Sequence, residues 1–202
     1  MFGQLRTACM MLLVFTLLTG LAYPLAITAA GQALFPRQAN GSLIIHGGKT
    51  LGSDLIGQPF DDPRYFWSRP SATTPQPYNA AASTGSNLSI GNPDQLKAIA
   101  DRVARLRQAD PELKEPIPAD LVMASGSGLD PHISPAAADI QISRVARVRH
   151  MDVTAVRQLV EEMTESRQWW LFGMPRVNVL RLNLALDGIR DEGPGHSWKD
   201  AI

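Results

Sequence analysis

The sequence predicts an α+β protein, with one N-terminal transmembrane helix followed by a small mixed α/β soluble domain. Residues 7–36 contain no charged side chain, and about 20 apolar residues in a helix suffice to cross a bilayer. Further along, cap-then-proline signatures at Asn92-Pro93 and Ser134-Pro135 predict helix starts. Short apolar runs at 43–45 and 176–180 are typical of strands. The expected order of strand, helix, strand, helix, helix and strand indicates the class but not the topology.

The length and composition suit one domain plus an appendage. The chain has 202 residues, a formal net charge of zero and 45% apolar residues, so it is neither disordered nor strongly basic in composition. A neutral chain without a basic face gives no indication of nucleic-acid binding. The single cysteine, Cys9, lies in the apolar stretch, and we therefore expect no disulfide in the domain.

The apolar stretch is predicted to be a membrane anchor. Its centre, residues 8–30, is longer than the apolar region of a cleavable secretory signal, although the small residues at 29–31 leave cleavage open as an alternative. Pro24 is expected to kink the helix. Arg6 is the only charged side chain before the stretch, and Arg37 is the first after it.

The charge distribution also predicts the orientation and the division of the chain. A short N-terminal segment with a large translocated domain is the simplest arrangement. We therefore expect residues 1–6 to form a cytoplasmic stub, 7–36 the transmembrane anchor and its exit, and 37–189 an extracytoplasmic globular domain. The polar residues 190–202 are expected to form a mobile tail.

The first half of the domain combines one strand, long loops and one helix. Residues 43–45 predict a strand that ends at the turn His46-Gly47-Gly48. The segment 60–71 is aromatic and broken by prolines, which predicts an ordered loop, and 71–93 has the composition of a linker. A helix is expected from Asn92 to about Gln108, with apolar residues at helical spacing: Leu96, Ile99, Ala100, Val103 and Leu106.

The second half begins with an expected strand at 118–124. A helix opens at Pro135 and runs, or restarts, to Arg149, and Asp152 caps a third helix. The run 176–180 predicts a further strand. Residues 180–186 are ambiguous, because they alternate like a strand yet precede the helix-ending pair Asp187-Gly188.

The most distinctive segment is the loop Ser-Gly-Ser-Gly-Leu-Asp-Pro-His-Ile-Ser-Pro at 125–135. In one interpretation its polar residues are local: Asp130 and Ser134 cap the following helix, and His132 forms a hydrogen bond nearby. In a second, the loop binds a nucleotide or another anion through its backbone amides and the positive end of that helix. The residues of this anion loop would be Ser125, Gly126, Ser127, Gly128, Asp130 and His132.

Catalysis and metal binding have little support in the sequence. It contains no P-loop lysine, no G-x-S-x-G elbow, no S-x-x-K and no H-E-x-x-H, so we predict no catalytic residues. The four histidines are scattered, which predicts no metal site. The alternative function is a membrane-anchored exported serine hydrolase that uses Ser127, Asp130 and His132. Arg144 and Arg147 on the following helix either add charge to an anion site or form a solvated helix face.

Two aromatic runs have more than one interpretation. Tyr65, Phe66 and Trp67, together with Arg69, are predicted as a partner interface, because such residues concentrate in interface hot spots. The alternative is that the three rings cover the domain core. The run Trp169–Phe172 belongs either to the core or to a surface that contacts a membrane or a partner.

Segments in order along nearly the whole chain resemble the family of C subunits of the Kdp potassium-transporting ATPase, the KdpC family. The match departs only in a loop, where Thr84 replaces a common glycine and residues 88–90 replace a more usual Leu-Gly-Pro. The segments that carry the resemblance are Tyr65–Ala72, Ser83–Leu88, Asn92-Pro93, Pro118–Val122, Ala124–Ala137, Arg144–Arg147, Pro175–Leu180 and Leu182–Asp187.

This resemblance implies a single-pass accessory subunit of a high-affinity, ATP-driven potassium import complex in a bacterial inner membrane. The implied partners are a channel-like subunit that selects potassium, a P-type ATPase subunit that hydrolyses ATP, and membrane lipid. The family is described as a catalytic chaperone that raises the ATP affinity of the ATPase subunit. We therefore expect no firmly bound cofactor, with ATP bound through the complex.

Overall fold

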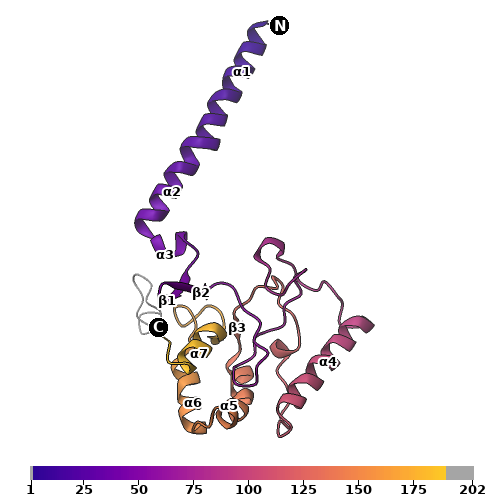
Figure 1. Ribbon diagram of the computed structural model, residues 1–202. Coiled ribbons are helices and arrows are strands. Elements are labelled where there is room, and N and C mark those ends of the chain that lie inside the picture. Colours follow the sequence, from indigo (N-terminus) through magenta and orange to yellow (C-terminus); the bar gives the residue numbers. More distant parts are fainter. Residues whose placement is uncertain (1, 190–202) are drawn as a thin grey trace. The chain divides into compact units, whose positions relative to one another are not determined.

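The computed structural model describes residues 2–189, and the predicted mobile tail at 190–202 lies outside the described residues. The chain divides into two compact units after Leu43. One N-terminal apolar helix forms most of the first unit, and a mixed helix and strand domain forms the second, as the sequence predicts (Figure 1).

The first unit contains one helix, Phe2–Leu34, that is long and apolar enough to cross a membrane by length and composition. It comprises α1 (Phe2–Leu17), a π-helical turn η1 (Leu18–Ala22) and α2 (Tyr23–Leu34). None of its apolar window is covered by protein. A short helix, α3 (Pro36–Ala39), follows.

The π-helical turn accommodates Pro24, where the sequence predicts a kink. Proline has no N–H and its ring crowds the carbonyl one turn before it, and a single wider turn is a common way to absorb such a defect. Here the N–H of Tyr23 bonds the carbonyl of Leu18, five residues back. The Thr19 hydroxyl donates to the Phe15 carbonyl at 2.7 Å.

The second unit contains two small sheets. Strands β1 (Leu43–His46) and β2 (Lys49–Ser53) pair with each other. The other sheet has the order β3-β5-β4 and is antiparallel, built from β3 (His132–Ile133), β4 (Thr164–Glu165) and β5 (Arg176–Asn178). Its central strand places Val177 opposite both Ile133 and Thr164.

Helices supply most of the core. They are α4 (Pro93–Ala109), α5 (Pro135–Arg149), α6 (Val153–Glu162) and α7 (Val179–Leu186), with short 3-10 turns η2 (Ala80–Ala82) and η3 (Ala119–Leu121) in the loops. Helices α5 and α6 pack together, as Figure 1 shows. The main apolar cluster joins α5, α6 and β5 to the aromatic loop, residues 60–71. Ile142, Val156 and Val177 are fully buried in it.

The predicted helix starts are confirmed by their caps. Side-chain oxygens of Asn92, Ser134 and Asp152 accept backbone N–H groups at the first turns of α4, α5 and α6. The residues at 180–186, which were ambiguous, are helical. Asn178 ends β5 and caps α7, with its Oδ1 accepting the N–H of Arg181 at 3.1 Å, so the predicted strand at 176–180 is two residues shorter.

The expected strand at 118–124 is wrong. Residues 119–121 form the 3-10 turn η3, and the side chains of Leu121 and of Val122, which follows the turn, are both buried. Consecutive buried side chains fit a turn, whereas a strand directs neighbours to opposite faces. The Asp120 carboxylate accepts the N–H of Ser134 at 2.6 Å, which holds the turn against the start of α5.

Candidate functional site

The loop at 125–132 is built on its own serine hydroxyls. Ser125 Oγ accepts the N–H of Gly128 at 2.9 Å, and Ser127 Oγ accepts the N–H of Leu129 at 3.1 Å. These are side-chain turns of the kind that serine favours in loops. Two backbone donors at the centre of the predicted anion loop are therefore already bonded within it.

Gly128 is the tightest position of the loop. Its φ is +67°, and a Cβ placed there would lie 2.6 Å from the Thr84 carbonyl oxygen and 2.7 Å from Thr73 Cγ2. The Ser71 hydroxyl donates to the Gly128 carbonyl at 2.7 Å. Segments 71–73 and 83–85 thus pack on the loop, so the stretch with linker composition serves as an ordered cover.

Asp130 connects this loop to the aromatic segment. Its Oδ1 accepts the backbone N–H of His132 at 3.0 Å and lies 3.3 Å from His132 Nδ1, and its Oδ2 pairs with Arg69 at 3.2 Å. Burial raises the pKa of the Asp130 carboxyl, but the side-chain and backbone hydrogen bonds from His132 and the Arg69 charge outweigh it and hold that pKa below its usual value.

The structure brings Asp130 and His132 together but does not join Ser127 to them. Within residues 2–189, no hydrogen bond links Ser127 to His132. A serine nucleophile requires such a contact with its base, so the hydrolase alternative is not supported. Ser134 caps α5 as expected, whereas Asp130 serves the N–H of His132 rather than the helix.

The predicted partner interface divides into buried and partly exposed residues. Phe66 is 0% and Trp67 8% exposed, so these two rings lie in the core, as the alternative interpretation holds. Tyr65 donates its hydroxyl to Asp187 at 2.8 Å. Arg69 donates to the Met123 carbonyl at 3.3 Å. Contact of Tyr65 and Arg69 with a partner stays a prediction.

Arg144 corrects the interpretation of the following helix as a solvated face. Its side chain is 2% exposed and donates to the carbonyls of Pro63 and Tyr65 and to Gln141. Arg147, in contrast, is partly exposed and pairs with Asp110 at 2.6 Å. The first arginine is therefore a core residue that fixes the aromatic loop, and neither reaches the loop at 125–132.

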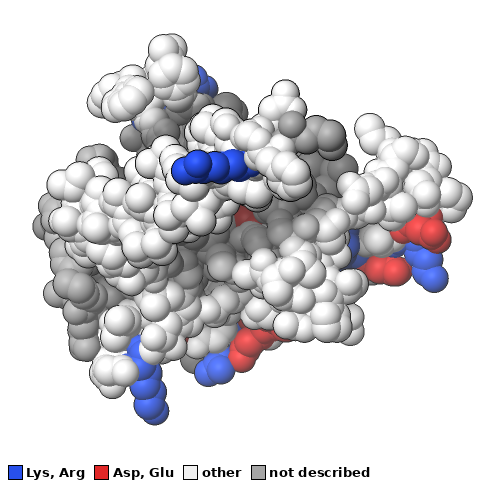
Figure 2. Space-filling model, turned by 90° about the horizontal axis from the view of Figure 1, so that it is seen from above, with Lys and Arg blue, Asp and Glu red and all other residues white. Residues whose placement is uncertain are grey.

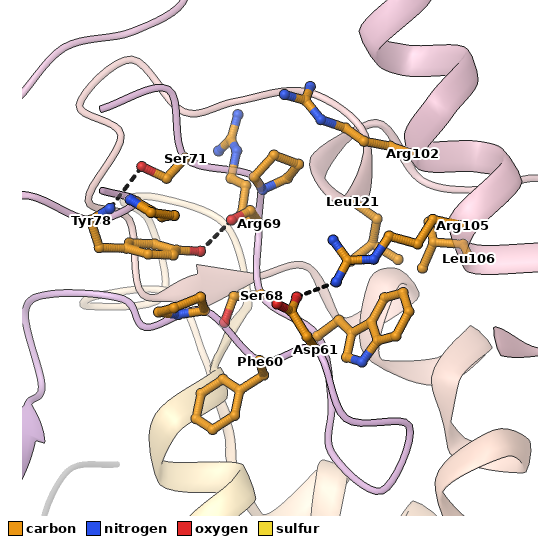
Figure 3. Close-up of a pocket in the computed structure, with 14 residues that line it drawn as sticks. Phe60, Asp61, Ser68, Arg69, Ser71, Tyr78, Arg102, Arg105, Leu106 and Leu121 are labelled. Atoms are coloured by element: carbon orange, nitrogen blue, oxygen red, sulfur yellow. Dashed lines mark hydrogen bonds and ion pairs between the residues drawn. The ribbon is translucent and has the colours of Figure 1, made fainter. Parts of the chain in front are cut away.

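A groove of about 260 Å³ lies between the aromatic loop and α4 (Figure 3). Arg105 pairs with Asp61 on one side of it, and Arg102 donates to the Val122 carbonyl at 2.7 Å. Burial lowers the pKa of Arg102 and raises that of Tyr78 to about 12. The Tyr78 hydroxyl donates to the Arg69 carbonyl. Because Arg69 also pairs with Asp130, this bond connects the groove to the loop at 125–132.

This groove is not predicted by the sequence patterns above. Arg102 and Arg105 lie three residues apart on α4, a spacing that places both on one face, and that spacing was the available signal. Among the residues the structure describes, Arg102 has no carboxylate partner. The groove can therefore accept a carboxylate or a carbonyl from another molecule, but it contains no nucleophile paired with a base.

On the face seen in Figure 2, charge marks no further site among the described residues. Figure 2 shows one face of the molecule, on which few acidic and basic side chains lie scattered among uncharged residues. In the part of the chain that the structure describes, no group of three or more His, Cys, Asp or Glu side chains is arranged to hold a metal ion.

Comparison with known proteins gives consistent matches over nearly the full length. The family model described as "K+-transporting ATPase, c chain" (KdpC) matches residues 5–188. A potassium-transporting ATPase KdpC subunit of Methylococcus capsulatus is 61% identical over 94% of this chain and all of its own length. The subunit of the same name from Sorangium cellulosum is 59% identical, also over 94% of this chain and all of its own length. That of Dechloromonas aromatica is 56% identical over 92% of this chain and 97% of its own length.

Proposed function

The chain belongs to the KdpC family, the c chain of the K+-transporting ATPase, and from this premise we propose that it is a non-catalytic accessory subunit that stabilises a potassium import complex. The observation that carries the proposal is the extent of the family match, which covers residues 5–188 and therefore both the apolar helix and the domain. An isolated domain match would leave the membrane context open.

The arrangement of the distinctive loop supports an accessory role. The polar side chains of Ser125, Ser127 and Asp130 serve hydrogen bonds within the domain. Side chains that form such internal hydrogen bonds stabilise the conformation of the loop. Catalysis instead needs a nucleophile or an acid–base group that is free to reach a substrate. The domain thus has the features of a rigid contact module.

The proposed partners are a potassium-selecting channel-like subunit and an ATP-hydrolysing P-type subunit, together with membrane lipid. The groove beside α4 is the contact surface that we assign to a partner, because Arg102 there has a carbonyl but no carboxylate partner in the described part of the chain. A carboxylate from a partner would gain a charge-assisted hydrogen bond at this position.

We also propose that any effect on ATP affinity is exerted through the assembly. If residues 37–189 lie outside the cytoplasm, as the N-terminal charge pattern favours, the domain does not touch cytoplasmic nucleotide. The anion loop is the counter-hypothesis, and it requires the amides of Gly128 and Leu129 to exchange their serine partners for a ligand. The location that we propose is a bacterial inner membrane, with the N-terminus in the cytoplasm.

The proposal is tested by extracting the chain in mild detergent from its native membrane under potassium limitation and identifying the co-purifying proteins by mass spectrometry. We expect a channel-like protein and a P-type ATPase in fixed ratio to the chain. Recovery of the chain alone, at full abundance, would contradict the accessory role. An Arg102→Ala variant is expected to lower the yield of the complex severalfold, and Arg107→Ala on the same helix is the matched control.

A further inference from the structure

The hairpin between β4 and β5 exposes an unusual number of large apolar side chains. The fractional exposures are 84% for Trp169, 92% for Trp170, 71% for Leu171, 56% for Phe172 and 71% for Met174. None of these residues belongs to either apolar cluster of the domain. Monomeric soluble proteins rarely leave such a contiguous apolar patch in water, so it marks a contact surface.

The backbone of the hairpin presents these side chains outward. Gln168 and Phe172 exchange both of their backbone hydrogen bonds at 2.9 Å, closing a tight loop. Within it Trp169 and Trp170 have φ values of +51° and +63°. This left-handed region is unfavourable for bulky residues, which Asn or Gly would occupy with less strain. Tryptophans therefore stand where folding alone would favour other residues.

The apolar tip of this hairpin, Trp169–Phe172, is accompanied by an unpaired positive charge. Arg167 approaches only the sulfur of Met174, at 3.9 Å, and has no carboxylate partner within the described residues. The neighbouring pair of Glu165 and Arg176, at 2.8 Å, is neutral as a unit, and residues 166–176 contain no acidic residue. The tip thus offers tryptophans and a cation, the combination that suits a layer of lipid headgroups.

The chain carries its own membrane anchor, which favours lipid over other occupants. The apolar helix ends at Leu34, and the second compact unit begins at Ile44. Even fully extended, the intervening segment reaches only about 30 Å, so the first residue of the domain cannot lie farther than that from the end of the helix. Tryptophan prefers the bilayer interface because its ring is apolar and its N–H is polar.

We propose that the tip at Trp169–Phe172 inserts into the interfacial region of the membrane that the chain's own helix crosses, with Arg167 at the phosphate level. The insertion would give the domain a second attachment and so limit its orientation. The inference concerns lipid only and does not depend on the potassium complex.

The test uses the full chain, carrying Trp198→Phe, reconstituted in phosphatidylcholine vesicles with and without phosphatidylglycerol. Only the fraction that resists carbonate extraction is measured, so the anchor is inserted in every sample. We expect lipids brominated near the headgroup end of the acyl chain to quench tryptophan emission, with at least about twofold less quenching when Trp169 and Trp170 are changed, because interfacial rings lie at that depth.

The variant is Trp169→Asn with Trp170→Asn, since asparagine tolerates the left-handed backbone and the hairpin should keep its fold. Trp67→Phe is the matched control and should retain the quenching, because Trp67 is 8% exposed. Arg167→Gln should weaken quenching only in vesicles that contain phosphatidylglycerol. Emission that is quenched by aqueous acrylamide and not by brominated lipid would overturn the proposal. Protection of the tip only when other subunits are added would assign it to a protein partner and overturn it equally.

Discussion

Arg144 is a buried cation whose partners are mainly backbone carbonyls. Its guanidinium donates to the carbonyls of Pro63 and Tyr65 and stacks 5.0 Å from the centre of the Trp67 ring. Burial lowers its pKa to about 10, so it stays protonated at neutral pH. A planar fork with five donors can satisfy several carbonyls that a loop leaves unpaired, and this single residue therefore orders the segment before Phe66.

Gly128 and Gly126 provide a matched pair that separates packing from ligand binding. Gly128→Ala should lower the free energy of unfolding by roughly 2–3 kcal/mol, because the left-handed φ is unfavourable and the new methyl meets the Thr84 carbonyl. Gly126→Ala meets nothing within 4 Å and has no left-handed φ, so it should leave the free energy of unfolding unchanged or raise it by up to about 1 kcal/mol. Urea unfolding of the full chain in detergent, followed by near-UV circular dichroism, measures both. Equal costs would contradict the packing account, and loss of complex assembly in a stable Gly126→Ala variant would favour a ligand-binding loop.

Asp130 predicts a component of acid sensitivity. Burial raises the pKa of this carboxyl, but hydrogen bonds from His132 and the charge of Arg69 lower it by more. The pKa in the folded protein therefore lies below the value of about 4 expected in the unfolded chain. Its stabilisation is therefore complete above about pH 4 and is lost as the pH falls through the folded-state pKa. Asp130→Asn should be less stable at pH 7 and should lose less stability between pH 5 and pH 3. Parallel pH profiles for variant and parent would exclude this contribution.

The residue types of the site were apparent from the sequence, but their partners were not. The cap at Ser134 and the turn at Asp130 involve residues within three positions, so local pattern predicts them. The burial of Arg144 depends on carbonyls about 80 residues away in the chain, and helical periodicity carries no information about them. The core position of Phe66 likewise depends on Asn183, 117 residues later.

At the scale of elements, side-chain amides on two helices bond the backbone of the aromatic loop in the way that a neighbouring strand would. Asn183 on α7 accepts the N–H of Phe66 at 2.9 Å and donates to its carbonyl at 3.0 Å. Gln141 on α5 accepts the N–H of Trp67 at 2.8 Å. These amides replace the backbone partners of a sheet, which explains how an extended segment lies buried between helices without unpaired polar groups.

Removal of the Asn183 amide should therefore be costly. Asn183→Ala leaves the buried N–H and carbonyl of Phe66 without partners and should lower the free energy of unfolding by about 2–4 kcal/mol. Asn92→Ala is the control, since it removes one exposed helix cap and should cost about 1 kcal/mol. Urea titration followed by near-UV circular dichroism compares the two. A cost for Asn183→Ala no larger than for Asn92→Ala would mean that solvent or another group replaces the amide.

The helices with caps and long apolar periodicity were predictable from the sequence and the two-residue strands were not, for a physical reason. Each predicted helix has a cap and several turns of apolar periodicity, both of which are local. Strands β3 and β4 contain two residues each, too few for any alternation, and they exist because β5 lies between them. The run at 118–124 has strand-like composition, yet no strand pairs with it in the described part of the chain.

At the scale of the whole molecule, one apolar helix and one compact domain make the orientation across the membrane the decisive property. From Thr7 onward the helix has no charged side chain and so offers no ion pathway of its own. The domain therefore acts on whichever side it occupies. An extracytoplasmic domain would reach a partner only at the outer surface of the membrane, whereas a cytoplasmic one would be exposed to nucleotide. The proposed role of assembly without nucleotide contact therefore depends on which side that is.

The orientation can be tested with single cysteines, because Cys9 is the only native one. Both variants are made in a Cys9→Ser background. Lys97→Cys lies on the exposed surface of α4 in the domain. Gln4→Cys lies near the N-terminal end of the apolar helix, before Arg6. We expect a membrane-impermeant maleimide to label Lys97→Cys in cells in which only the outer membrane is permeabilised. Gln4→Cys should be labelled only after lysis, because basic residues near a span are retained in the cytoplasm. The reverse pattern would place the domain in the cytoplasm, refute the assembly-only account of ATP affinity and make the loop at 125–132 a direct candidate for nucleotide.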